Sequence, residues 1–108
     1  MHVRSRRLFG PVLADAGATV LYPAAAPGVE QTLVKSMRIV NVTNEAQTFD
    51  LCTDVVDEAH ALYWRAVVPP RGLISDGEWW VCPPDETIVC NVDEAGALVF
   101  RGSGAVLS

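Results

Sequence analysis

The sequence predicts an all-β domain, an antiparallel sandwich of about eight strands, and three observations support this. Short apolar segments recur along the chain, separated by turn residues about every 8–12 positions. No segment keeps a 3.6-residue apolar period over about ten positions, as a helix would require. A length of 108 residues suits one domain with a modest core.

The first half of the chain divides into four predicted strands. They span residues 8–13, 19–22, 32–42 and 48–53. Residues 23–28 contain two prolines and a glycine, which forbid regular structure there. In the longest strand, alternation places Met37, Ile39 and Asn41 on one face, opposite Ser36, Arg38, Val40 and Val42.

The second half begins with an acidic loop over residues 54–58, and strands follow it at 60–68, 87–92 and 97–101. Residues 73–75 and 78–82 are predicted as one strand interrupted near Asp76-Gly77, and 105–107 as a short final edge. Trp79 and Trp80 are adjacent, so they face opposite sides of their strand. Trp80 shares the core side with Cys82, whereas Trp79 and Val81 face outward, where an uncovered tryptophan indicates an interface or a covering layer.

The charge pattern predicts a basic arm at residues 1–7 preceding a single domain at 8–108. The net charge is −5, which argues against nucleic acid as a partner. Arg4, Arg6 and Arg7 nevertheless lie together at the N-terminus. They either dock onto an acidic neighbour or onto another copy of the same acidic domain, or they form a solvated terminus.

The same region lacks the apolar stretch of a secretion signal, and no apolar run in the chain is long enough to span a bilayer. We therefore expect no membrane association, synthesis in a reducing cytoplasm, and three cysteines that remain thiols.

Neither a metal site, a cofactor site nor a catalytic site is expected. Cys52, His60, Cys82 and Cys90 lack the close spacing of zinc ligands, and the sequence offers no nucleophile elbow, phosphate loop or metalloprotease helix. The acidic loop lacks the alternating ligands and central glycine of a calcium loop. Asn41-Val42-Thr43 matches a glycosylation sequon, but Asn41 is predicted to face inward.

Several segments, taken in order, resemble small phage virion structural proteins found among tail and capsid genes. The segments are Arg7-Leu8-Phe9-Gly10, Thr19-Val20-Leu21-Tyr22, Lys35 to Val42 with Thr43-Asn44, Ala61-Leu62-Tyr63, Pro83 to Ile88, and Leu98 to Gly104. One departure is Asp85, which stands where such proteins have glycine before the acidic residue of a late turn.

The resemblance implies an immunoglobulin-like or jelly-roll sandwich, a non-enzymatic virion protein made in the bacterial host cytoplasm. A minor tail protein near the tail tip is favoured, with a capsid decoration protein as the alternative. Its expected partners are other virion proteins and further copies of itself, with a trimer as the first expectation. The expected interface residues are Arg4, Arg6, Arg7, Tyr63, Trp64 and Trp79. A carbohydrate- or receptor-binding module using Tyr63, Trp64 and Trp79 remains open.

Overall fold

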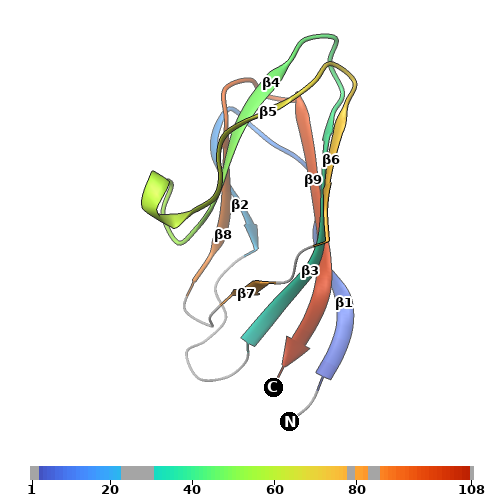
Figure 1. The fold of residues 1–108 in the computed structure, drawn as a ribbon, viewed down its shortest axis with the longest axis vertical. Coiled ribbons are helices and arrows are strands. Elements are labelled where there is room, and N and C mark those ends of the chain that lie inside the picture. Colours follow the sequence, from blue (N-terminus) through green and yellow to red (C-terminus); the bar gives the residue numbers. More distant parts are fainter. Residues whose placement is uncertain (1–2, 23–30, 78–79, 83–85, 108) are drawn as a thin grey trace.

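Two antiparallel sheets pack face to face in the computed structural model, which describes residues 3–22, 31–77, 80–82 and 86–107 (Figure 1). Sheet A has the order β1 (Val3–Leu13), β9 (Leu98–Leu107), β3 (Gln31–Asn41) and β6 (Leu73–Asp76), and β7 (Trp80–Cys82) also pairs with β3. Sheet B has the order β2 (Gly17–Tyr22), β8 (Ile88–Val92), β4 (Gln47–Thr53) and β5 (Ala61–Val68). A single 3₁₀ turn, η1 (Glu58–His60), completes the described elements. The predicted all-β sandwich is confirmed.

The strands pair as one long hairpin rolled across both sheets. β6 lies along Met37–Val40 and β7 along Thr32–Val34, so the two form the interrupted strand predicted from Asp76-Gly77. With these counted as one, the first strand pairs with the last, the second with the second-last, and so inward to β4 and β5. This is the winding of a jelly roll; an immunoglobulin-like sandwich would place the first two strands in one sheet.

The core lies between the sheets and is formed by the inward-facing residues of their strands. Phe49 of β4 packs edge-on against Phe100 of β9, with ring centroids 5.7 Å apart. Met37, Ile39 and Asn41 are at most 4% exposed, which confirms the predicted inner face of β3. Burying such apolar side chains stabilises the sandwich by roughly 1.5–3 kcal/mol each.

The structure differs from the predicted arm at residues 1–7, because β1 already begins at Val3. Its backbone pairs with β9 from Val3 opposite Leu107 to Leu13 opposite Val99. The physical reason is that β9 continues to Leu107 and offers hydrogen-bonding partners along its whole length. Arg7 fits in this strand because its side chain is exposed.

β9 is also longer than predicted, since residues 102–104 join the two segments expected to be separate. Gly102 and Gly104 resemble turn residues in the sequence, but their role is close packing. A Cβ on Gly102 would lie 2.5 Å from the Phe9 ring, and one on Gly104 would lie 1.9 Å from the Leu33 carbonyl oxygen.

Asn41 organises the corner where β3 ends. Its side-chain amide donates to the carbonyl oxygens of Glu45 at 2.7 Å and of Val68 and Pro69 at 3.1 Å. Its Oδ1 accepts from the Thr43 backbone N–H at 2.9 Å. The side chain of this sequon asparagine is 1% exposed, and its hydrogen bonds stabilise the corner.

Candidate docking surface

The outer face of sheet A carries a row of apolar side chains that crosses four strands. Leu13 lies opposite Val99, Val99 opposite Val40, and Val40 opposite Leu73. We call these four residues the apolar row. Leu13 and Leu73 at its ends are 57% and 53% exposed. Contiguous apolar side chains on an outer sheet face are typical of interaction sites.

A cationic depression adjoins this row on the same face. It has a volume of about 370 Å³. Its lining residues, from β1, β3 and β9, are Arg7, Ser36, Arg38, Arg101, Gly102 and Ser103. We call it the arginine depression. Val40 and Arg38 are two residues apart on β3, as are Val99 and Arg101 on β9, so the row and the depression are continuous.

The register of β3 and β9 places like charges together in the depression. Arg38 lies directly opposite Arg101, and Ser36 lies opposite Ser103, which also pairs with Arg7. Within the described part of the chain, the ion pairs involve Arg65 and His60 and none of the depression's three arginines. Like charges directly opposite each other destabilise a sheet, so an anion bound here would offset a cost that the isolated chain carries.

Of the predicted interface residues, Arg7 lies on β1 of sheet A, whereas Tyr63 and Trp64 lie on β5 of sheet B. Arg7 lies in the depression, whereas the side chains of Arg4 and Arg6 lie outside the described residues, as does Trp79. Val81 is 51% exposed and Cys82 is 2% exposed, which confirms the predicted phase of that strand at these two positions.

Tyr63 and Trp64 are adjacent on β5, where Tyr63 is partly buried and Trp64 is exposed. The Tyr63 ring packs against Phe49 with centroids 5.6 Å apart, and its hydroxyl donates to Asp76 of β6. Tyr63 thus joins the edges of the two sheets. Trp64 is 40% exposed on sheet B. The two rings therefore do not form one shared platform.

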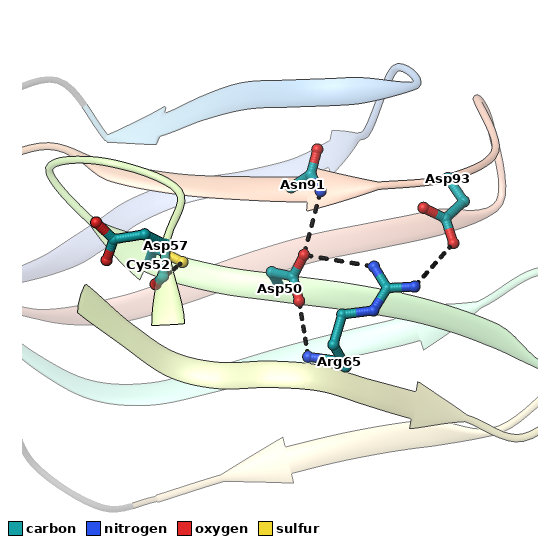
Figure 2. A network of polar contacts seen from close by, with 6 residues as sticks. All are labelled: Asp50, Cys52, Asp57, Arg65, Asn91 and Asp93. Atoms are coloured by element: carbon teal, nitrogen blue, oxygen red, sulfur yellow. Dashed lines mark hydrogen bonds and ion pairs between the residues drawn. The ribbon is translucent and has the colours of Figure 1, made fainter. Parts of the chain in front are cut away.

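The exposed position of Trp64 coincides with an irregularity in β5, where Trp64 and Arg65 lie between the paired residues Tyr63 and Ala66. Arg65 has a φ of +50°, and its backbone N–H donates to Asp50 at 2.7 Å. Asp50 is 2% exposed and also accepts from Asn91 at 3.1 Å, while the Arg65 guanidinium lies 3.6 Å from it (Figure 2). The same guanidinium lies 3.5 Å from Asp93. This network satisfies a buried carboxylate and fixes the bulge.

The acidic loop, residues 54–58, leads into η1 beside sheet B. Asp57 caps this turn, accepting from the His60 backbone N–H at 2.9 Å and lying 2.7 Å from its Nδ1. This contact raises the pKa of His60 and lowers the pKa of Asp57. Asp54 and Glu58 are exposed, and Val55 between them is 46% exposed. The loop therefore presents two carboxylates beside an apolar side chain.

The described cysteines are buried thiols. Cys52 donates to the Asp57 carbonyl oxygen at 3.6 Å, and Cys82 to that of Glu86 at 3.4 Å. Burial raises the pKa of Cys52 and raises the pKa of Cys90 to about 11. These two thiols are therefore protonated at neutral pH, which does not suit a nucleophile. No cluster of three or more His, Cys, Asp or Glu side chains within the described ranges is placed to hold a metal ion.

Sequence reasoning missed Arg38, Arg101 and the apolar row as a surface. The alternation of β3 does put Arg38 and Val40 on its outer face. Alternation within β3 does not show how this strand pairs with β9, which is about 60 residues away. That pairing brings Arg101 beside Arg38 and Val99 beside Val40.

The helical part of the described chain is the three-residue η1, so it contains no helix able to cross a membrane. Among the family models, curated proteins and solved structures compared with this chain, none matches it.

Proposed function

We propose that this chain is a structural, non-enzymatic component of a bacteriophage virion that acts by protein–protein assembly. The favoured position is a minor tail protein near the tail tip, with capsid decoration as the alternative position. The proposal rests on the resemblance of its strand and turn segments to small phage virion proteins. In this proposal its partners are other virion proteins and further copies of itself, and it is made in the host cytoplasm.

The observation that carries an assembly function is the apolar row beside the arginine depression. Its end residues, Leu13 and Leu73, are each more than half exposed. Apolar side chains next to arginines are the composition of protein interfaces, whose buried centre is apolar and whose charged contacts set register. The jelly-roll winding is compatible, because viral capsid domains use this architecture.

A second candidate function is recognition of a carbohydrate or receptor. The specific observation in its favour is Trp64, which is 40% exposed on sheet B, and jelly rolls also occur in lectin domains. The inward packing of Tyr63 against Phe49 weakens this candidate, because it removes one of the three rings from the proposed sugar platform.

Mass spectrometry of purified particles tests the virion proposal. Particles are isolated after induction of the bacterium that encodes the chain, banded on a density gradient and digested. We expect peptides of this chain at a fixed ratio to the major tail or capsid protein, and immunogold labelling at the tail tip. A chain that is abundant in the lysate but absent from banded particles would contradict the proposal. Binding to a glycan array by the wild type, lost in Trp64→Ala, would favour the second candidate.

A further inference from the structure

The arginine depression is a concentration of positive charge on a chain whose net charge is −5. Three guanidinium groups line it, and none of them has an ion-pair partner among the described side chains. Guanidinium binds carboxylate through two parallel hydrogen bonds, and the hydroxyls of Ser36 and Ser103 add neutral donors on the same wall. The chemistry of the depression is therefore that of a carboxylate receptor.

We propose that the arginine depression binds the acidic loop of a second copy of this chain. This inference rests on the proposed assembly function and specifies the contact through which copies of the chain associate. The loop offers what the surface lacks: Asp54 and Glu58 supply carboxylates for the arginines. Val55, 46% exposed between them, supplies an apolar contact for the neighbouring row.

The positions of the two surfaces decide the type of contact. The depression lies on the outer face of sheet A, whereas the loop with η1 projects from the opposite side of the molecule, beyond sheet B (Figure 1). One copy cannot use its own loop to fill its own depression, because the sandwich stands between them. The contact joins two different patches and is heterologous, so repetition gives a closed ring when the rotation closes and a filament otherwise.

Light scattering and sedimentation of the full chain at pH 7.5 test this contact, over a range of concentrations at about 50 and about 500 mM salt. We expect wild-type self-association that weakens at high salt, because exposed charge pairs are screened. Arg38→Glu should weaken it by about tenfold or more, since it sets a like charge against the loop. Arg71→Glu is the matched control, with the same charge change at an exposed turn position outside the depression.

The loop is tested in the same way. Glu58→Lys should weaken association to a similar extent, and Glu45→Lys, an exposed acid in another turn, should not. The double variant Arg38→Glu/Glu58→Lys keeps the wild-type net charge and should recover most of the lost association.

Loss of folding would not explain a weakened contact in the Arg38→Glu variant. The introduced carboxylate would lie opposite Arg101, so the substitution replaces a repulsion by an attraction within the sheet. We expect the isolated subunit of this variant to unfold at the wild-type temperature or above.

Two results would overturn the inference, and they differ from failure of the virion proposal. Association that is equally insensitive to Arg38→Glu and Glu58→Lys would place the self-contact elsewhere. A wild-type chain that stays monomeric at the lower salt concentration would remove the second copy as occupant and leave the depression to carboxylates of another protein. In both cases the particle experiment still decides independently whether the chain is a virion component.

Discussion

Replacing Asp50 by asparagine should destabilise the fold strongly although it hardly changes the shape of the side chain. The carboxylate is 2% exposed and accepts from the Arg65 N–H at 2.7 Å and from Asn91 Nδ2 at 3.1 Å. An asparagine has one acceptor oxygen, so its NH₂ group must face one of these two donors. The lost charge-assisted hydrogen bond is worth roughly 1.5–3 kcal/mol.

The ion pair with Arg65 adds little, because this side chain is 50% exposed and solvent screens it. We therefore expect Asp50→Asn to lower the free energy of unfolding by about 2–3 kcal/mol and the melting temperature by about 10–20 °C. Urea denaturation followed by tryptophan fluorescence and circular dichroism measures this, with an unchanged m-value.

Asp93→Asn is the matched control, because Asp93 is 61% exposed and contacts the same guanidinium at 3.5 Å. Its expected effect is at most about 0.5 kcal/mol. If the two variants unfold at the same urea concentration, burial and hydrogen bonding of Asp50 do not stabilise the fold.

Three further predictions concern packing, titration and thiol reactivity. Gly102→Ala should lower the free energy of unfolding by about 1–3 kcal/mol, because its Cβ would overlap the Phe9 ring. Gly77→Ala, whose Cβ would have no atom within 4 Å, should be nearly neutral in the same denaturation assay. In an NMR titration, Asp57→Asn should return the raised pKa of His60 toward 6.5; an unchanged value would assign the shift to another cause. In the wild type, the stabilising contribution of protonated His60 is fully present below pH 6.5 and is lost as the pH rises through its raised pKa. The contribution of ionised Asp57 is lost at the acid end, as the pH falls through its lowered pKa. The three buried cysteines should react with a thiol reagent at mildly alkaline pH only as fast as the chain opens, and rapid native labelling of any of them would contradict their burial.

Local pattern was sufficient for most strands and for the faces of β3 from Ser36 to Asn41, where burial alternates and Asn41 continues the alternation. Before that stretch, the register shift between Val34 and Ser36 breaks the alternation. Local pattern was insufficient where strand pairing overrides local composition. Arg7 resembles part of a basic arm, and Gly102 resembles a turn residue, yet β1 and β9 pair through both. Local alternation does not show the closeness of Gly102 to Phe9, because that depends on a strand about 90 residues away.

The candidate site shows the same limit more sharply. Each of Arg38 and Arg101 is an ordinary exposed arginine in its own strand, and only the register of β3 with β9 makes them a cluster. Tyr63 and Trp64 are a different case, because alternation already places adjacent residues of a strand on opposite faces. What depends on other strands is the set of partners that Tyr63 finds on the inner side, Phe49 of β4 and Asp76 of β6.

The rolled hairpin has a consequence for how the chain is made. β9 lies between β1 and β3, so sheet A cannot close until the last strand has left the ribosome. Until then β1 lacks its pairing strand among the described elements, and β3 is paired on one edge only. Folding should therefore begin at the central β4–β5 hairpin, where loop closure costs least, and finish with the two ends of the chain. A nascent chain stalled before residue 98 would hold an incomplete sheet with open edges, the state in which β proteins are most prone to aggregate.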